Sequence, residues 1–215
     1  MTATRPEPAP LPGRFVSLEP LRRDHLPALY AAIGHPVVFA GGYGGGPQAF
    51  RDSEAGFIDW AETYFRWDDC NPYAIFLVGG PHDGELVGTT TLADFEPIRE
   101  ATHIGWTAYD PRVWGTAVNA EAKLLLLSLA FGHGFGRVKI QADALNERSR
   151  AAIAGIGATF EGIVRRDLPR ADGSWRDSAV FSIIVGDWPR VRAGLEQRLE
   201  RQGDRPVLFR TRSMG

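Results

Sequence analysis

Most of the chain shows either alternation of apolar and polar residues or apolar residues at helical spacing. Alternation and β-branched runs predict strands over residues 14–20, 73–78, 85–92, 101–109, 137–142, 160–168 and 174–185. Apolar residues three and four apart predict helices over residues 21–33, 117–133, 146–156 and 187–201, and one more that follows Ser53. The glycine run over residues 41–46 is predicted to be a mobile loop. Strands bunched in the middle and interleaved helices predict one α/β sheet of mixed strand direction.

No internal repeat or linker divides the predicted core. We expect a flexible segment at residues 1–12, one domain over residues 13–202 and a C-terminal tail over residues 203–215. The proline-rich start has no apolar stretch of the kind found in signal peptides. The longest apolar run, near residues 124–131, is too short to span a bilayer. The sequence therefore predicts a cytoplasmic protein that uses no membrane.

Charge and cysteine content exclude several classes of protein. The 24 basic and 26 acidic residues nearly cancel, so the net charge of −2 gives no global reason to bind nucleic acid or an anionic membrane. The single cysteine, Cys70, excludes a disulfide framework and a cysteine-rich metal cluster. The histidines lack the spacing of metal ligands, and we expect no metal.

The segment from Tyr109 to Asn119 carries the clearest chemical signal. A predicted strand ends, a short loop follows, and a long helix begins. Small residues over 115–117 let the backbone approach a bound group closely, and the helix start presents unpaired N–H groups. Arg112 adds a positive charge, so the segment predicts a site for phosphate. The alternative is a turn whose small residues serve only helix packing. Neither a Walker loop nor a dinucleotide fingerprint fits, because the residues that define them are missing.

The loop resembles a known family motif. Arg112-x-x-Gly115-x-Ala117 is similar to the Gln/Arg-x-x-Gly-x-Gly/Ala pyrophosphate loop of the GNAT acyltransferases. Asn146-x-x-Ser149, followed by Ile-Gly-Ala at 156–158 and Glu-Gly at 161–162, resembles the branch that acetylates ribosomal-protein N-termini, the RimJ/RimL type. The resemblance covers roughly residues 13–200.

The resemblance implies a fold and a cofactor. The fold would be a mixed, mostly antiparallel central sheet, splayed at the cofactor site and flanked by helices. The cosubstrate would be acetyl-CoA or another acyl-CoA. The residues that the resemblance places on it are Trp106, Thr107, Ala108, Arg112, Val113, Trp114, Gly115, Thr116, Ala117 and Asn146. Asn146 is equally suited to cap the helix that follows, and both roles are compatible.

The catalytic residues are less sharply indicated. Many relatives have a tyrosine about seven residues after the asparagine to protonate the leaving thiolate, but Ile153 stands there. Ser149, one helical turn earlier, is our candidate to hydrogen-bond that thiolate, with a surface or capping role as the alternative. Asp94 is our candidate base. The other candidates left open are Glu96, His103, Glu161 and Asp177.

These features together predict an N-acyltransferase. It would move an acetyl or other short acyl group from acyl-CoA to a primary amine by direct attack, without a covalent acyl-enzyme. The acceptor would be a protein N-terminus or a small-molecule amine, and the branch resemblance implies a homodimer. Two alternatives from other classes are a CoA-binding sensor or scaffold that has lost transfer, and a nucleotide-phosphate binder that uses the same loop.

Overall fold

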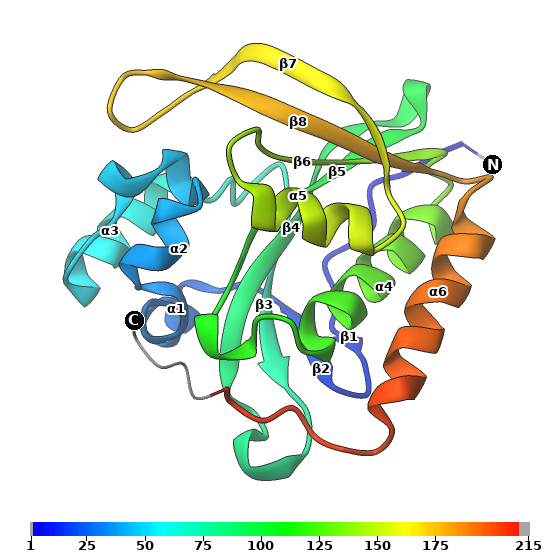
Figure 1. Ribbon diagram of the computed structural model, residues 1–215, viewed down its shortest axis with the longest axis horizontal. Coiled ribbons are helices and arrows are strands. Elements are labelled where there is room, and N and C mark those ends of the chain that lie inside the picture. Colours follow the sequence, from blue (N-terminus) through cyan, green and yellow to red (C-terminus); the bar gives the residue numbers. More distant parts are fainter. Residues whose placement is uncertain (1, 211–215) are drawn as a thin grey trace.

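The computed structural model describes residues 2–210 and consists of one eight-stranded sheet covered by helices (Figure 1). The strand order is β1-β2-β3-β4-β5-β6-β8-β7, and every neighbouring pair is antiparallel except β5 and β6. The strands are β1 Leu11–Pro12, β2 Val16–Pro20, β3 Asn71–Leu77, β4 Leu86–Glu96, β5 Ala101–Tyr109, β6 Arg137–Asp143, β7 Thr159–Pro169 and β8 Trp175–Ile184. The predicted mixed, mostly antiparallel sheet is confirmed.

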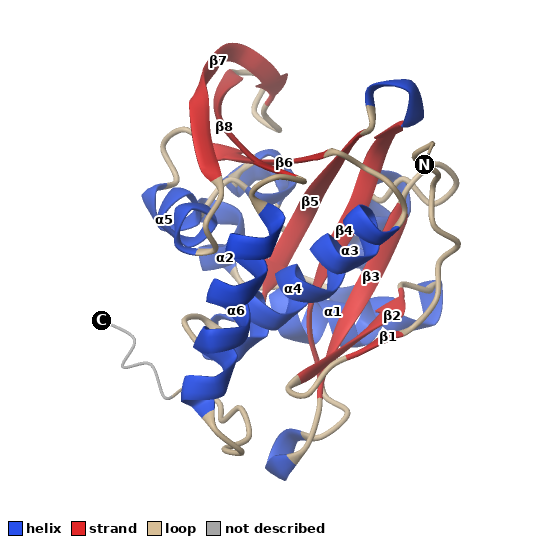
Figure 2. Ribbon diagram, turned by 90° about the vertical axis from the view of Figure 1, so that its right-hand side faces the viewer, coloured by secondary structure: helices blue, strands red, loops and turns tan. Residues whose placement is uncertain are grey.

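Helices cover both faces of the sheet (Figure 2). One apolar cluster joins the sheet to α1 Leu26–Ile33, α2 Pro36–Ala40 and α3 Glu54–Tyr64. A second, larger cluster joins it to α4 Ala117–Gly132, α5 Glu147–Gly155 and α6 Trp188–Gln202. Among these helices of residues 2–210, none is long and apolar enough to cross a membrane.

The start of the domain differs from the predicted pattern. The single helix expected over residues 21–33 is a short 3₁₀ turn, Arg23–His25, followed by α1. Pro36 follows the end of α1, as expected, but it also begins α2. Proline is tolerated in the first turn of a helix because the N–H it lacks has no partner there. The proline therefore separates two helices where the sequence indicated only an end.

Some described residues of the predicted flexible segment and of the predicted tail pack against the domain. Ala3 is buried, and Arg5 donates to the backbone carbonyls of Asp68 and Cys70 at 3.0 and 2.8 Å. Val207, beyond the end of α6, is buried in the larger core cluster. Residues 1 and 211–215 of those two predicted segments lie outside the described residues.

A buried carboxylate fixes α4, which carries much of the candidate site. Glu121 accepts hydrogen bonds from the backbone N–H groups of Arg14, Phe15 and Val16 at 2.9, 2.6 and 2.7 Å. Three charge-assisted bonds satisfy an anion that would otherwise be costly to bury. They tie the beginning of β2 to the second turn of α4.

The sheet opens between its two parallel strands. β5 pairs with β6 only from Ala101 and Arg137 to Ile104 and Ile140. Beyond Ile104, β5 carries an irregularity at Trp106, whose φ of +47° is unusual for a residue with a side chain. The two strands then run on without pairing each other, which leaves backbone groups on their facing edges available to a ligand.

Candidate active site

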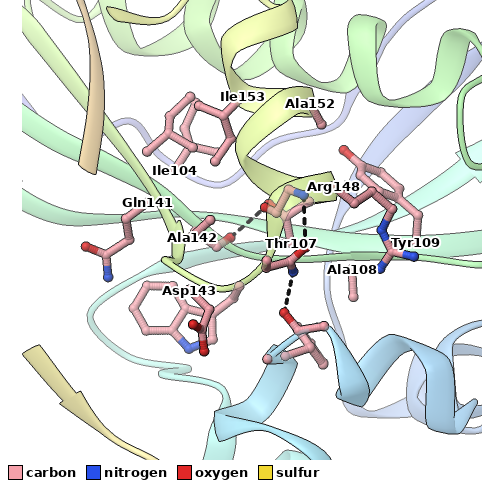
Figure 3. A pocket seen from close by; sticks show the side chains of 18 of the residues that line it. Ile104, Thr107, Ala108, Tyr109, Gln141, Ala142, Asp143, Arg148, Ala152 and Ile153 are labelled. Atoms are coloured by element: carbon pink, nitrogen blue, oxygen red, sulfur yellow. Dashed lines mark hydrogen bonds between the residues drawn. The ribbon is translucent and has the colours of Figure 1, made fainter. Parts of the chain in front are cut away.

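A cavity of about 1010 Å³ occupies the opening between β5 and β6. Figure 3 shows Thr107, Ala108 and Tyr109 of β5 on one side of it, Gln141 and Asp143 of β6 on the other, and α5 above. The cavity extends to the loop before α4 and to the glycine run between α2 and α3. That glycine run, which we predicted to be a mobile loop, is a wall of the cavity.

Most of the residues expected to bind the cofactor line this cavity. They are Trp106, Thr107, Ala108, Val113, Trp114, Gly115, Thr116 and Asn146. Arg112 and Ala117 belong to the same segment but are not part of the cavity wall. The two catalytic candidates, Ser149 and Asp94, both line the cavity.

Side chains of the loop before α4 fix the conformation of its backbone. Asp110 accepts a hydrogen bond from the N–H of Arg112 at 2.7 Å, and Thr116 caps α4 by accepting from the N–H of Val118 at 3.4 Å. Gly115 has φ +73°, a conformation that favours glycine. Its N–H has no hydrogen-bond partner among residues 2–210. The loop therefore presents an unpaired backbone donor beside a helix N-terminus, a combination that suits an anion.

Arg112 does not point its charge into the cavity. Its guanidinium forms an ion pair with Asp110 at 2.6 Å, and Asp110 is fully buried. The hydrogen bond to Asp110 raises the pKa of Arg112. One face of the guanidinium lies 3.8 Å from the centre of the Phe209 ring. The positive charge that we expected beside the phosphates is balanced by a carboxylate instead.

Asn146 and Ser149 form the start of α5. The Asn146 side-chain oxygen accepts from the N–H of Ser149 at 2.9 Å, so the capping role is present. The amide nitrogen donates to the carbonyl of Gly41, which attaches α5 to the glycine run. The Ser149 hydroxyl lines the cavity and bonds to no other described residue. Its hydrogen is therefore available to a ligand.

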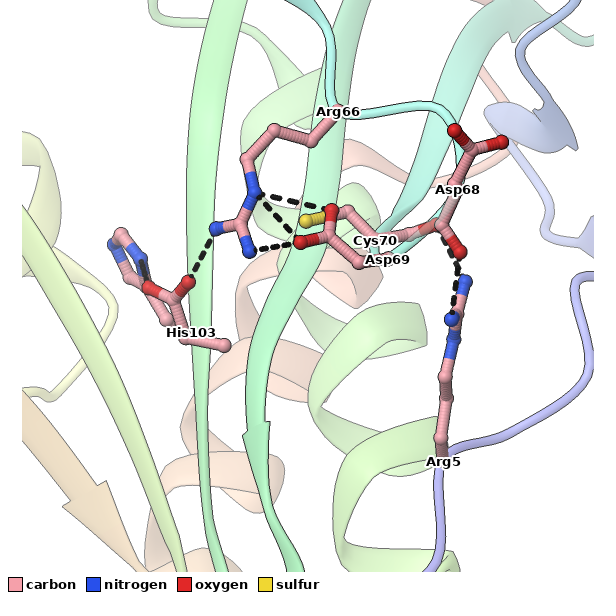
Figure 4. Close-up of polar contacts among 7 residues, drawn as sticks. Arg5, Arg66, Asp68, Asp69, Cys70 and His103 are labelled. Atoms are coloured by element: carbon pink, nitrogen blue, oxygen red, sulfur yellow. Dashed lines mark hydrogen bonds and ion pairs between the residues drawn. The ribbon is translucent and has the colours of Figure 1, made fainter.

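An Asp–His pair lies at the closed end of the opening. Asp94 accepts from Nδ1 of His103 at 3.0 Å and from Nη1 of Arg66 at 2.6 Å. Figure 4 shows Arg66 between Asp69 and the carboxylate beside His103. Both oxygens of Asp94 are occupied, and the carboxylate fixes the orientation of the imidazole ring.

Burial and these bonds set the charges of the pair. The hydrogen bond from His103 holds the pKa of Asp94 well below its usual range, and the bond from Arg66 adds to the effect. Burial lowers the pKa of His103, which is 4% exposed. With Asp94 ionised, Nδ1 carries the proton and Nε2 is left as the acceptor. His103 is one of the residues that line the cavity, and its Nε2 is buried beside Gly105 without a hydrogen-bond partner in the described structure. This arrangement gives a neutral base that can take one proton.

The other candidate bases lie outside the cavity. Glu161 is paired with Arg137 and accepts from the Ser182 hydroxyl at 2.7 Å, and the ion pair lowers the pKa of Glu161 to about 2. Glu96 pairs with Arg99, and Asp177 accepts from the backbone of Arg166. These three carboxylates have structural partners and no access to the site.

Lys123 is a cavity residue that we did not predict. Its side chain is buried, and Nζ donates to the hydroxyls of Thr90 and Thr107 at 3.2 and 2.9 Å. Burial lowers its pKa to about 7. The sequence contained a signal for its burial, because Lys123 lies three residues after Ala120 and four before Leu127 and therefore shares a helix face with these apolar residues, both of which are buried.

The far end of the cavity is built from segments distant in sequence. The turn between β7 and β8 reaches the glycine run, where Ala171 N–H donates to the carbonyl of Gly45 at 3.0 Å. Tyr43 lines this end, and its buried hydroxyl has no partner within residues 2–210. Arg176, which donates to the Ser178 hydroxyl, lines it from β8. Only the fold brings these groups together.

Within residues 2–210, no group of three or more histidine, cysteine, aspartate or glutamate side chains lies close enough together to hold a metal ion. The groups that the site brings together are an imidazole, a serine hydroxyl, a buried amine and open backbone donors. These suit proton transfer and the polarisation of a carbonyl.

Known proteins share both the sequence pattern and the architecture. A family model for the GNAT acetyltransferase domain matches residues 16–159. No curated protein matches the chain in sequence. A T. thermophilus protein assigned as an acetyltransferase is 33% identical, with a TM-score of 0.80 over 91% of this chain and 100% of that one. A GCN5-related N-acetyltransferase from Brucella melitensis is 25% identical, with a TM-score of 0.79 over 91% of this chain and 87% of that one.

A more distant structure comes from the branch that the sequence motifs resemble. Mycobacterium smegmatis RimJ, in complex with CoA-disulfide, is 22% identical, with a TM-score of 0.66 over 90% of this chain and 91% of that one. At that identity the similarity concerns the fold alone. The family model covers more than half of the chain, and it matches the loop, the splayed strands and the start of α5. The chain therefore belongs to the GNAT family of acetyltransferases.

Proposed function

We propose that this protein transfers an acetyl or other short acyl group from acyl-CoA to a primary amine by direct attack. Family membership gives the acetyl transfer, and the amine acceptor is our inference. The observation that carries it is one cavity with the anion-binding loop along its wall and the unpaired Nε2 of His103 at its closed end. The cavity thereby offers backbone hydrogen-bond donors for the acyl-CoA and a base for the amine, with the two substrates side by side.

The cofactor would lie along the opening between β5 and β6. Its pyrophosphate fits the N–H of Gly115 and the N-terminus of α4, where an anion is favoured. Its pantetheine amides fit the unpaired edge of β5 over Trp106, Thr107 and Ala108. Backbone N–H groups on that edge would polarise the thioester carbonyl as charge develops on its oxygen.

His103, and not Asp94 itself, is our proposed base. The amine arrives mostly as an ammonium and must lose a proton before it attacks. Nε2 of His103 accepts this proton, directly or through a water molecule, and Asp94 stabilises the imidazolium that results. Asp94, whose pKa is held low by His103 and Arg66, is a weak base and serves to position the ring.

Ser149 would act on the leaving group. Attack forms the bond between nitrogen and the acyl carbon, and collapse of the intermediate breaks the bond between that carbon and sulfur. The Ser149 hydroxyl, open to the cavity, donates a hydrogen bond to the thiolate that forms. Ile153 lines the same wall and cannot supply a proton.

We also propose that the protein pairs with a second copy of itself. The β7–β8 hairpin lies at the edge of the sheet, and large apolar residues on it are exposed, with Phe160 48% and Trp175 46% accessible. Edge strands and apolar patches of this kind are often covered in an assembly. A monomer mass by light scattering at micromolar concentration would count against a homodimer.

The transfer is tested with acetyl-CoA and a panel of amines. The panel comprises a polyamine, amino acids, an aminoglycoside and peptides with free N-termini. We expect thiol release above the hydrolysis rate with at least one amine, and a product heavier by one acetyl group in the mass spectrum. Tight CoA binding, without thiol release from acetyl-CoA that depends on any amine of the panel, would favour the sensor or scaffold alternative.

A further inference from the structure

The chain after α6 folds back onto the loop before α4. It leaves the helix at Gly203, which has φ +62°, and continues outside any helix or strand to residue 210. Figure 1 shows this segment in red below the start of α4. Val207 is 3% exposed and belongs to the larger core cluster, so the segment is anchored by apolar burial. We call residues 206–210 the C-terminal strap.

Phe209 fixes the end of the strap beside the loop. Its ring stacks on His82 with centroids 3.8 Å apart, and the Arg112 guanidinium lies 3.8 Å from its centre on the loop side. The backbone N–H of Arg210 donates to the carbonyl of Arg112 at 2.9 Å. A stacked aromatic ring, a cation and a backbone hydrogen bond together set the position of Arg210.

Arg210 lies directly over the loop that presents the open donor. Its Nη2 donates to the carbonyl of Gly115 at 3.0 Å. A side-chain carbon added at Gly115 would lie 3.0 Å from Nη1 of Arg210. The cation is therefore next to Gly115, which lines the cavity and whose backbone N–H has no partner within residues 2–210.

The two arginines that contact the loop differ in how their charges are balanced. Arg112 is neutralised by buried Asp110. Arg210 is exposed and forms no ion pair with any carboxylate of residues 2–210. Arg198 of α6 lines the same cavity. The loop thus combines open backbone donors with an uncompensated guanidinium, whose fork of N–H groups matches phosphate oxygens.

We propose that the C-terminal strap is part of the acyl-CoA site and that Arg210 binds a phosphate group of the nucleotide end of CoA. The inference rests on the proposed function, since it needs CoA in the cavity. The phosphate is either the pyrophosphate or the 3′-phosphate, which share this chemistry. Arg210 of the strap supplies the unpaired positive charge beside the loop, whereas the charge of Arg112 is paired with Asp110.

The test measures CoA binding by calorimetry at low salt for the parent and for Arg210→Ala. The control is Arg205→Ala, which removes an exposed arginine of the same segment that bonds only to carbonyls at the end of α6. We expect Arg210→Ala to weaken CoA binding about tenfold, Arg210→Lys to recover part of the loss, and Arg205→Ala to match the parent. The parent's affinity should also fall more steeply with added salt than that of Arg210→Ala.

The same titration with 3′-dephospho-CoA identifies the phosphate. An equal loss for both ligands assigns Arg210 to the pyrophosphate, and a loss for CoA alone assigns it to the 3′-phosphate. Arg210→Ala and Arg210→Gln that both melt and bind CoA like the parent would overturn the inference and leave the proposed function intact. A parent that binds no CoA would overturn both.

Discussion

The two halves of the cavity differ in how their charges are balanced. On the cofactor side, the loop offers an unpaired N–H at Gly115 and the uncompensated guanidinium of Arg210. On the acceptor side, beside the Asp94–His103 pair, the guanidinium of Arg66 is held by Asp69 and Asp94.

The difference matches the two kinds of ligand that an acetyl transfer brings together. A polyanion binds more tightly to hydrogen-bond donors and cations that lack protein partners, because each new bond displaces water and breaks no contact within the protein. An amine that must lose its proton gains from a base held neutral in a fixed position. The buried pair of Asp94 and His103 supplies such a base. The roles of the two halves can therefore be tested separately, with variants that affect the binding or reaction of one ligand and leave the other unchanged.

The largest effect is expected at the acceptor side. His103→Gln keeps a polar side chain but removes the base, so we expect kcat to fall by about 10² to 10⁴ with CoA affinity unchanged. His35→Gln, a change at an exposed histidine outside the cavity, should match the parent. Steady-state kinetics with one accepted amine and calorimetry with CoA measure the two quantities. Full turnover in His103→Gln would remove the base from the mechanism.

The same variant has a pH signature. Burial lowers the pKa of His103 below its ordinary value of 6.5, so the base is neutral above that range and protonated below it. The kcat of the parent should therefore fall as the pH drops through the lowered pKa of His103, which lies below 6.5, and should not change with the protonation of this group at higher pH. His103→Gln should lose this acid limb. An unchanged limb would assign it to another group.

Ser149 links the two halves, because its hydroxyl would act on sulfur when charge has built up there. Ser149→Ala should lower kcat about a hundredfold and leave the KM for acetyl-CoA nearly unchanged. Asn146→Ala should instead raise that KM, because Asn146 holds the start of α5 and, in the proposed site, would hold the cofactor in ground and transition states alike. Pre-steady-state kinetics must show that chemistry limits the rate. Full turnover in Ser149→Ala under that condition would make the serine structural.

Gly115→Val tests the cofactor side alone. A β-branched residue is strained at φ +73°, and its side chain would occupy the place next to Arg210 where, in the proposed site, the phosphate would approach. We expect CoA binding to weaken tenfold or more, about 1.4 kcal/mol. Gly194→Ala on α6, where an added carbon meets nothing within 4 Å, is the control. Unchanged CoA affinity in a folded Gly115→Val would contradict the cofactor assignment.

The smallest effect concerns the buried amine of Lys123, which we compare with Glu121 on the same helix. Glu121 has three backbone donors, whereas Lys123 has two hydroxyls and no carboxylate partner among residues 2–210. Burial lowers the pKa of Lys123 to about 7 from 10.5, so between these values the unfolded chain binds more protons than the folded one. The free energy of unfolding should therefore rise with pH over that window.

Lys123→Met should remove this rise, because the ionisable group is gone. It should also stabilise the protein at neutral pH by roughly 1 kcal/mol, since no amine must then be buried. Urea unfolding between pH 7 and 10 measures both quantities, with Lys139→Met, at a half-buried lysine of β6, as a comparison. A slope that persists in Lys123→Met would contradict the assignment to this side chain.

The amino-acid sequence by itself determined most of the strands and helices and the conformation of the loop before α4. The strands, the long helix after Gly115 and the cap at Asn146 depend on periodicity and on contacts between near neighbours, such as the bond from Ser149 N–H to Asn146. Interactions of that kind are set within a few residues, and their pattern is readable before the chain folds.

Only the tertiary structure decided which charges reach the site. Asp94 and His103 both stood among the candidates, but their contact depends on the pairing of β4 with β5. The pKa of Lys123 depends on burial against strands more than ten residues away in the sequence. Arg112 was expected beside the phosphates, whereas in the structure its guanidinium contacts Asp110 and Phe209. Phe209 and Arg210 reach the loop across nearly a hundred residues of chain. Burial and long-range contacts set the charge and direction of these side chains, and no local pattern encodes them.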